Sequence, residues 1–435
     1  MRIIRACREL GIKTVAVYST ADKKALHRLI ADEAVCIGPP SPKDSYLNGR
    51  ALISACEITG ADAIHPGFGF LSENSKFVSL SAKCGIKWIG PDSAAMSAMG
   101  DKANAKKTMR AAGVPVIPGS DGIVETVEAA KTVSAEIGYP VMVKASAGGG
   151  GRGIRFVANE SELEEALSSA KADARNYFGN DDVYIEKFIV NPRHIEIQIL
   201  ADEQGNVIHL GERDCSCQRR NQKLLEESPS PGLTSGLRKK MGEAAVAAAK
   251  ACGYKNAGTV EFLVSRDKKF YFCEMNARIQ VEHPVTEAVT GVDIVKEQLK
   301  IAAGKPLSYS QTDIKLTGHA IECRINAEVP AENFRPCPGT INSFHLPGGF
   351  GVRVDTAMYQ GCAIPPYYDS LIAKVIVHSD SRQEAIKKMQ VALSEFVIEG
   401  IDTNVDFQLK LLRDAEFIRG ETDIGFLGRK MKDLL

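Results

Sequence analysis

The stretch at residues 258–286 sets the strongest limits on what this chain can fold into. Two alternating runs, rich in β-branched and aromatic residues, flank a polar Ser-Arg-Asp-Lys turn, which predicts the two strands of a hairpin. Side chains repeat with a period of two along a strand, so Glu274 and Asn276 share a face, and Glu261 meets them from the partner strand if the register allows. Their oxygens are hard donors, which suit Mg²⁺ held together with nucleotide phosphates.

A dense polar set directly follows the predicted hairpin. It comprises Arg278, Gln280, Glu282 and His283. A core strand does not carry four such groups without partners, so this segment is a candidate site. The hairpin acids have a second interpretation, in which Glu261 and Glu274 pair with nearby lysines on a solvated face. The hairpin taken alone does not decide between the two interpretations.

The length and the charge balance limit the possible architectures and partners. The chain has 435 residues, which predicts about two to four domains. Lys and Arg together number 54, as do Asp and Glu, so no net charge attracts nucleic acid or an anionic membrane. No apolar run approaches the roughly 18 residues of a membrane span, and the N-terminus has no secretory signal pattern. We therefore expect a cytoplasmic protein with no nucleic-acid or membrane partner.

The eleven cysteines are scattered and odd in number, and no C-x-x-C motif occurs. Many lie in apolar contexts, so we interpret them as reduced core residues of a cytosolic protein. Cys215 and Cys217 lack a second ligand pair, and a zinc site is not expected there.

Three regions differ in their pattern. Strands and helices alternate with short loops over residues 1–100, which predicts a parallel α/β domain. Its motif at residues 65–74 follows a strand, where open α/β sheets bind ligands, although a glycine-rich turn into a helix fits the spacing equally well. Residues 115–190 indicate a small α+β unit. From residue 314 onward, strands separated by Pro, Gly and Tyr predict an antiparallel third domain that ends in helices.

A glycine run lies between two predicted strands of the small unit. Lys144 ends the first strand, and Gly148, Gly149, Gly150 and Gly151 follow, then Arg152. This is not a P-loop, because no G-K-[ST] follows and no helix opens at its end. Glycines let the backbone approach phosphate oxygens closely, and they also suit a mobile lid. A flexible turn that binds no ligand is the alternative.

Two further polar segments allow more than one interpretation. Residues 212–223 are crowded with charges, which is typical of a surface loop but also fits a pocket for a small anion. Glu322 and Arg324 share a face of a predicted strand. Arg324 either faces a carboxylate within its own domain or serves a site.

A lysine-bearing strand with a glycine-rich hairpin, a strand that ends in EKFI and an acidic hairpin that ends in EMN are together typical of ATP-grasp enzymes. The strings HPGFGFLSEN, KASAGGGGRG, ERDCSCQRRNQK, EMNARIQVEHPVTE and ECRINAE resemble the biotin carboxylase family over essentially the whole chain. The resemblance implies a multidomain α/β and α+β fold. Its parts are an N-terminal parallel α/β domain at 1–100 that lacks its usual first strand, an ATP-grasp domain at 101–308 with a mobile lid at about 116–188, and a mainly antiparallel C-terminal domain with helices at 319–428.

The resemblance also implies a nucleotide site with two divalent cations, Mg²⁺ or Mn²⁺. The residues expected to contact the ATP phosphates are Lys102, Lys144, Gly148, Gly149, Gly150 and Gly151. Those expected to border the adenine or line the rest of the nucleotide site are Glu186, Lys187, Ile189, His194, Gln218 and Asn221. The expected metal ligands are Glu261, Glu274 and Asn276, of which the first two also belong to the nucleotide site.

The same resemblance implies sites for bicarbonate and biotin. The residues expected to bind bicarbonate are Lys223, Arg278, Gln280 and Val281, with Glu282 as the base. Arg324 is expected to face the biotin ureido group, near Phe68. The family commonly has Tyr at position 68 and His at position 221, where this chain has Phe68 and Asn221.

The implied reaction is ATP-dependent carboxylation of biotin through carboxyphosphate. The chain contains no biotinyl-lysine motif and no carboxyltransferase domain, so the expected partners are a separate biotin carboxyl carrier protein and carboxyltransferase subunits. A homodimer is also expected. Acetyl-CoA carboxylase is the expected enzyme, and propionyl-CoA, pyruvate or other acyl carboxylases are alternatives. A non-catalytic nucleotide-binding relic and a ligase of the carbamoyl phosphate type are the remaining alternatives. The latter would need a duplicated chain, and no internal repeat occurs.

Overall fold

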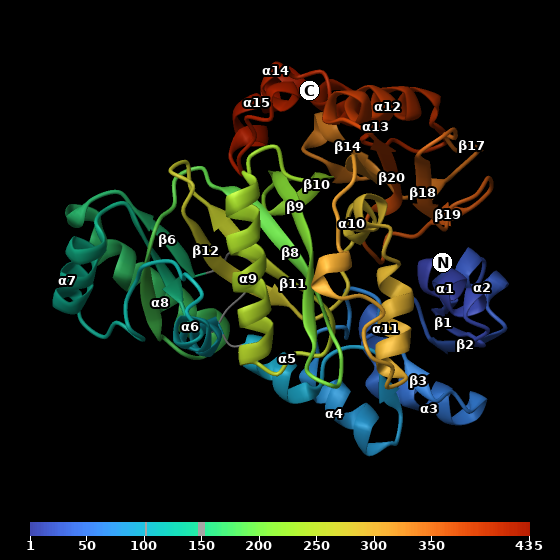
Figure 1. The fold of residues 1–435 in the computed structure, drawn as a ribbon, viewed down its shortest axis with the longest axis horizontal. Helices are drawn as coiled ribbons and strands as arrows, with labels where there is room; N and C mark the ends of the chain where they lie inside the picture. The colour runs from blue at the N-terminus through green and yellow to red at the C-terminus, as the bar shows by residue number, and fades with distance from the viewer. Residues whose placement is uncertain (101, 147–152) are drawn as a thin grey trace.

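The structure, a computed structural model, describes residues 1–100, 102–146 and 153–435. Figure 1 shows four groups of elements: the N-terminal elements at the lower right, a small unit with α7 and α8 at the left, a large sheet in the middle, and the C-terminal helices at the top. None of the helices in the described part of the chain is long and apolar enough to cross a membrane. All eleven cysteines are free thiols.

The N-terminal region contains two pairs of parallel strands, as the alternating pattern predicts. The pairs are β1 (Val15–Ser19) with β2 (Glu33–Gly38), and β3 (Ala63–Ile64) with β4 (Lys87–Trp88). The helices of this region are α1 (Arg2–Glu9), α2 (Leu26–Ile30), α3 (Gly49–Thr59), α4 (Ser75–Lys83) and α5 (Ser93–Gly100). The motif at residues 65–74 follows β3, so it lies at the carboxyl end of a parallel strand, where ligand sites form in such sheets.

The small unit is a three-stranded antiparallel sheet, in the order β6-β5-β7, with helices packed on it. Its strands are β5 (Val141–Ala145), β6 (Ile154–Val157) and β7 (Val183–Lys187), and its helices are α7 (Val127–Ile137) and α8 (Leu163–Phe178). The predicted strands on both sides of the glycine run therefore pair with each other. The run itself, at positions 148–151, lies outside the described residues. Helix α6 (Lys102–Ala111) leads into this unit from the N-terminal region.

An eight-stranded sheet forms the centre of the molecule, in the order β12-β11-β8-β9-β10-β13-β20-β18. Its strands are β8 (Arg193–Ala201), β9 (Val207–Arg219), β10 (Gln222–Ser228), β11 (Asn256–Val264), β12 (Phe270–Asn276), β13 (His319–Asn326), β18 (Val352–Thr356) and β20 (Leu371–Ser379). Strands β11 and β12 are the predicted hairpin. Because β10 pairs with β13, the sheet of the ATP-grasp region continues into the C-terminal region.

The charged segment at residues 212–223 is not the surface loop that its composition suggested. Most of it belongs to β9 and β10, and Glu212, Arg213 and Asp214 are all buried. Burial is possible because each charge has a partner. For example, Arg238 donates to both carboxylate oxygens of Glu212 at 2.7–2.9 Å.

Helix α9 (Ser235–Ala251) lies across one face of the central sheet (Figure 1). The alternating Ile195, Ile197 and Ile199 of β8 are fully buried in a cluster with Met241 and buried alanines of α9. Helices α10 (His283–Thr290) and α11 (Ile294–Ala302) follow the hairpin, and Thr286 of α10 bonds to Arg213 on the opposite face. The sheet is thus covered on both faces.

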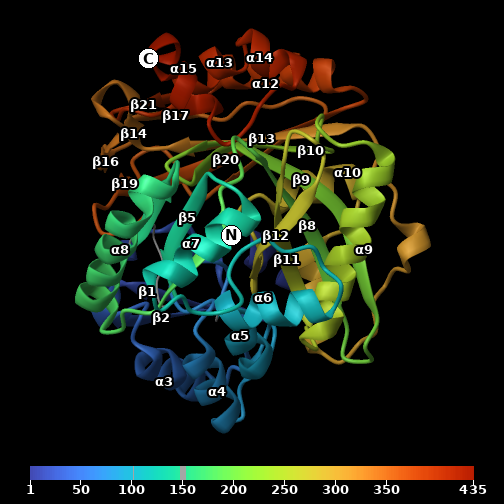
Figure 2. The same ribbon diagram turned by 90° about the vertical axis from the view of Figure 1, so that its left-hand side faces the viewer.

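The C-terminal region packs β13 and β20 against helices, which Figure 2 shows as a layer along the top of the molecule. These helices are α12 (Arg382–Glu395), α13 (Val405–Leu411), α14 (Ala415–Arg419) and α15 (Phe426–Leu434). Short strands complete the region: β14 (Glu328–Val329), β15 (Arg335–Pro336), β16 (Gly339–Thr340), β17 (Ser343–His345), β19 (Ala363–Ile364) and β21 (Val397–Glu399). The predicted combination of antiparallel strands and helices is confirmed.

Candidate active site

A row of charged side chains crosses four strands of the central sheet. Glu261 of β11 lies opposite Glu274 of β12 on one side and opposite Glu196 of β8 on the other. Glu196 in turn lies opposite Arg213 of β9. Directly opposed side chains in antiparallel strands have Cβ atoms roughly 4.5–5.5 Å apart, so neighbouring carboxylates in this row would repel one another without cations.

Lys223 of β10 supplies a shared cation. Its ammonium donates to Glu196 at 2.6 Å, to Glu282 at 2.7 Å and to Glu261 at 3.0 Å. Burial alone would lower the pKa of Lys223, but these three carboxylates raise it well above its usual value. Arg213, which is fully buried, adds a second cation through its bond to Glu196 at 2.5 Å.

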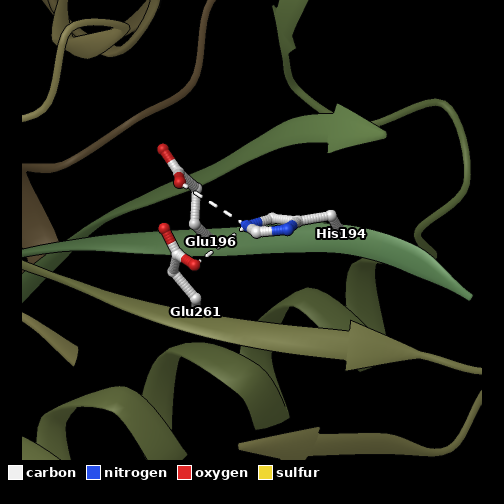
Figure 3. Close-up of side chains that lie close together, drawn as sticks. All are labelled: His194, Glu196 and Glu261. Carbon is white, nitrogen blue, oxygen red and sulfur yellow. Dashed lines mark ion pairs between the residues drawn. The ribbon is translucent and has the colours of Figure 1, made fainter. Parts of the chain in front are cut away.

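His194 lies beside two of these carboxylates, Glu196 and Glu261, as Figure 3 shows. Its Nε2 is 3.2 Å from Glu261 and 4.0 Å from Glu196. Burial would lower the pKa of His194, and the charge of Glu261 outweighs this and raises it. The pKa of Glu261 is lowered against the effect of burial, first by Lys223 and then by His194. Glu196 and Glu261 therefore each lie beside more than one cationic or basic side chain.

The segment after the hairpin folds back over the carboxylates. Arg278 donates to Asn276 at 3.0 Å and to Gln280 at 2.8 Å, and its Nε donates to Glu73 at 2.9 Å. Glu73 belongs to the motif at residues 65–74, so the N-terminal region holds this arginine in place. The amide of Gln280 reaches Glu261 at 3.4 Å.

Glu282 immediately precedes α10 and is fully buried between two cations. One of its oxygens accepts from Lys223 at 2.7 Å, and the other accepts from Arg324 at 2.8 Å. Burial would raise the pKa of Glu282, but Lys223, Arg324 and Arg213 together hold it well below its usual value. Glu282 is therefore a carboxylate at neutral pH, and it can accept a proton.

Arg324 has a second carboxylate partner. Its Nε donates to Glu226 of β10 at 2.6 Å. Neither Glu226 nor Glu282 lies in the C-terminal segment 319–428, so the interpretation in which Arg324 faces a carboxylate of its own domain is wrong. The guanidinium reaches across the β10–β13 boundary into the same polar face as Lys223.

Several residues expected at the nucleotide site lie in the small unit or in the helix that leads into it. Lys144 of β5 donates to Glu186 of β7 at 2.6 Å, and Lys106 of α6 also pairs with Glu186. Lys187 donates to the backbone carbonyls of residues 138 and 139 at 2.8–2.9 Å. Ile189 follows β7 and is half-buried. Lys102 is the first residue of α6, and its side chain lies outside the described part of the structure.

The remaining candidate residues lie at the margins of this site. Gln218 is buried at the end of β9, whereas Asn221 occupies the turn before β10 with a φ of 65°. Phe68 is 43% exposed and lines a cavity of about 270 Å³ together with His283 and Lys374. Lys374 donates to the carbonyl of Val281 at 2.6 Å, so this cavity lies next to the segment that carries Glu282.

Sequence reasoning missed several members of this site, namely Glu73, Glu196, Arg213 and Glu226. A usable signal exists for Glu196, because it occupies a polar position of the alternating strand at residues 195–200. Arg213 and Glu226 belong to charged segments whose composition is typical of an exposed surface. Their burial depends on partners from distant parts of the chain, which no local pattern reveals.

The arrangement suits binding and deprotonation of a small anion. Lys223 and Arg278 supply positive charge, and Glu282 is an ionised base that contacts one of these cations directly. Glu261, Glu274 and Asn276 add hard oxygen donors on the edge strand β12 and its neighbour β11, which fits a divalent cation carried with phosphates. The small unit, which carries Lys144, lies beside these strands. The fold and the site define an ATP-dependent ligase that activates a small anion.

Comparisons with known proteins agree with this class. Residues 1–96 match the family described as "Biotin carboxylase, N-terminal domain", residues 101–310 match "Carbamoyl-phosphate synthase L chain, ATP binding domain", and residues 322–429 match "Biotin carboxylase C-terminal domain". Biotin carboxylase 1 of Bacillus subtilis is 59% identical, over 98% of this chain and 95% of that protein.

Two solved structures are also similar. The biotin carboxylase of Campylobacter jejuni in complex with β,γ-ATP is 52% identical with a TM-score of 0.93, over 98% of this chain and 96% of that one. The biotin carboxylase domain dimer of Hydrogenobacter thermophilus 2-oxoglutarate carboxylase, in complex with MgADP, ADP and bicarbonate, is 51% identical with a TM-score of 0.93, over 100% and 96% of the two chains. The chain described here belongs to the biotin carboxylase family.

Proposed function

We propose that this chain uses ATP and bicarbonate to carboxylate biotin on a separate carrier protein, and that the residues described above carry out the reaction. The γ-phosphoryl group of ATP passes to bicarbonate and gives carboxyphosphate and ADP. Carboxyphosphate then breaks into CO₂ and phosphate, phosphate takes the N1 proton of biotin, and N1 attacks CO₂. The observation that carries this proposal is the buried Glu282 carboxylate between the Lys223 ammonium and the Arg324 guanidinium.

Bicarbonate fits beside Glu282. Lys223, Arg278 and Gln280 would bind its oxygens, and the backbone of Val281 would complete the site. Bicarbonate is a poor nucleophile until it is deprotonated, and Glu282 is the carboxylate within reach of it. When the anion takes over the positive charge of Lys223, Glu282 loses part of its own pairing and becomes a stronger base. The same cations neutralise the charge that develops during phosphoryl transfer.

ATP would lie between the small unit and the central sheet. Lys144, at the end of β5, would exchange its contact with Glu186 for the phosphates, and Lys102 would add a second positive charge. The glycine run at positions 148–151 would close over the phosphates. Exclusion of water matters here because carboxyphosphate hydrolyses readily.

Other residues would complete the nucleotide and metal sites. The adenine would be bordered by Glu186, Lys187 and Ile189, with His194, Gln218 and Asn221 lining the rest. Mg²⁺ or Mn²⁺ would be held by Glu261, Glu274 and Asn276, and the bound cation would neutralise phosphate charge. The hairpin suits this role because Glu261 and Glu274 are paired in register.

Biotin would lie against Arg324 and near Phe68. A guanidinium presents several donors in a fixed plane, which suits the ureido oxygen once negative charge develops on it. Among the described residues, no hydrogen bond uses Nη1 of Arg324, so one donor nitrogen remains for biotin.

The proposed partners are a biotin carboxyl carrier protein and the carboxyltransferase subunits of an acetyl-CoA carboxylase. The similarity to a 2-oxoglutarate carboxylase domain favours a second candidate, in which the same subunit serves a 2-oxo acid carboxylase. A homodimer is supported by the dimeric relative. Free thiols support a cytoplasmic location. We also propose domains at 1–100, 101–308 and 319–428, with the lid at about 116–188.

Phosphate release from ATP, measured with and without bicarbonate and free biotin, tests the proposal. We expect release to require bicarbonate and to rise with biotin. Equal release after bicarbonate has been removed would overturn the assignment. Assays with purified carriers from the candidate carboxylases would then identify the partner, because the true carrier should be carboxylated at the lowest concentration.

A further inference from the structure

Two buried carboxyl groups behind Arg324 have no role in the steps described above. Glu226 of β10 and Glu322 of β13 lie directly opposite each other in the β10–β13 pair, and both are fully buried. Side chains in this relation have Cβ atoms roughly 4.5–5.5 Å apart, so the two carboxyl groups are neighbours.

Three oxygens of these two groups lack a hydrogen-bond donor within the part of the chain that the structure describes. They are Oε2 of Glu226 and both oxygens of Glu322. The nearest cations do not supply the missing donors: Arg324 donates to Glu282 and to the other oxygen of Glu226, and Lys374 donates to the carbonyl of Val281. Among the described residues, Arg324 is the one donor to this pair. Two ionised carboxylates with a single donor would be very costly in a buried site, and a proton shared between them removes most of that cost.

We propose that Glu226 and Glu322 share one proton and act together as the positioning pair for Arg324. The O–H of Glu322 donates to Oε2 of Glu226, whose other oxygen accepts from Nε of Arg324 at 2.6 Å. Arg324 then donates to Glu282 through Nη2 at 2.8 Å. A chain of hydrogen bonds therefore connects Glu322 to the proposed base and fixes the plane of the guanidinium. This inference rests on the proposed role of Arg324 toward biotin.

The electrostatics agree with this geometry. Burial raises the pKa of Glu226 to about 7, with Arg324 opposing the shift and Glu282 adding to it. Burial also raises the pKa of Glu322 well above its usual value, although Lys374 opposes the shift. The pair therefore keeps a proton at neutral pH and loses it as the pH rises.

Three ionisable groups near the pair have pKa values that are shifted away from that of Glu226. Helix α10 packs on this face of the sheet and carries His283 and Glu287. Burial lowers the pKa of His283 to about 3, and the pKa of Glu287 is lowered to about 2. Lys223 stays charged, because its carboxylate partners raise its pKa. An alkaline change in the geometry of Arg324 would therefore report the carboxyl pair.

Two variants separate the members of the pair. Glu226→Gln replaces the carboxylate that Arg324 contacts, so we expect a higher KM for biotin and a loss of about 10- to 100-fold in biotin-dependent kcat/KM. Bicarbonate-dependent ATP hydrolysis without biotin should fall far less. Glu322→Gln still offers an N–H to Glu226, so it should lose less biotin-dependent activity, and it should remove the alkaline fall of that activity.

Glu227→Gln is the matched control. Glu227 is the next residue of β10, it is equally buried, and it pairs with His319 and Arg382 instead of with the site. This variant should change stability without changing the ratio of biotin-dependent to biotin-independent activity. Equal losses of both activities in Glu226→Gln would overturn the proposal, as would an unchanged alkaline fall in Glu322→Gln.

Infrared spectroscopy tests the shared proton without any assay of activity. The wild-type protein at neutral pH should show the C=O band of a protonated carboxyl group, and Glu322→Gln should lack it. A band that persists in Glu322→Gln would overturn the pair. If the pair passes this test while the wild type shows no biotin-dependent activity, the proposed function fails and the carboxyl pair stands.

Discussion

Along β8, Ile195, Ile197 and Ile199 pack against α9, whereas Glu196 and Gln198 on the opposite face lie in a network of charges and amides. All five side chains are fully buried. The apolar face is stabilised by burial, at about 1.5–3 kcal/mol for each large side chain. The attraction within a buried ion pair seldom exceeds the free-energy cost of its desolvation. The contrast indicates that the isoleucine face supports the fold, and that the chain keeps the polar face for chemistry.

The largest difference between the two faces should appear in catalysis. Glu282→Gln removes the proposed base, so bicarbonate-dependent ATP hydrolysis should fall by roughly 10²- to 10⁴-fold. Ile197→Val, on the other face, should leave kcat unchanged. Steady-state phosphate release from both variants measures the contrast. A Glu282→Gln enzyme with near wild-type turnover would show that the polar face does not supply the base.

The second difference concerns stability. Lys223→Met leaves Glu196, Glu261 and Glu282 without their shared cation, so the free energy of unfolding should fall by about 3–5 kcal/mol. Urea unfolding followed by circular dichroism measures this change. Met keeps most of the volume of Lys, so a loss of packing contributes little. If the free energy of unfolding fell by less in Lys223→Met than in Ile197→Val, the three carboxylates would not depend on Lys223.

The hairpin and its neighbours also show how far the sequence alone could lead. Alternation predicted β11 and β12, and their acids do lie in register. The same logic failed for residues 212–223, because charged residues were taken as exposed. The buried Arg213 donates hydrogen bonds to side chains of three other elements, namely Glu196, Gln198, Thr259 and Thr286. A local sequence pattern does not show which distant residues will be these partners. The continuity of the sheet through β10 and β13 likewise depends on the pairing of two strands that are far apart in sequence.

The ionic contacts should respond to acid, unlike the apolar face. Arg2 and Arg353 both bond to Glu287. Against the effect of burial, the charges of His283, Arg2 and Arg353 lower the pKa of Glu287 from an ordinary value of 4.5 to about 2. A carboxylate whose folded pKa is lowered contributes stability above its unfolded pKa and loses that contribution as the pH falls. About 3 kcal/mol should therefore disappear between pH 4.5 and about 2 from this group alone.

Denaturant unfolding at a series of pH values measures this loss, and Glu287→Gln is the test variant. Its free energy of unfolding should vary less with pH across that window than that of the wild type. The deficit of Ile197→Val relative to the wild type should stay constant with pH, since no titrating group is involved. Identical acid profiles for the wild type and Glu287→Gln would contradict the assignment.

The smallest effect should come from the apolar face itself. Ile197→Val removes one methylene from a fully buried position, which costs about 0.5–1.5 kcal/mol in the free energy of unfolding. Urea unfolding at neutral pH measures this cost. A change in the KM for ATP or bicarbonate in this variant would show that the two faces are coupled.

The most direct test is the transfer of labelled carbon from bicarbonate to biotin. It is compared in the wild type, Glu282→Gln and Ile197→Val, and it tests whether the polar face of the sheet carries out the reaction while the apolar face does not. We expect the wild type and Ile197→Val to form labelled carboxybiotin only when ATP is present, and Glu282→Gln to form almost none while it remains folded. Equal transfer by all three proteins, or transfer without ATP, would contradict the assignment of the polar face as the site of carboxylation.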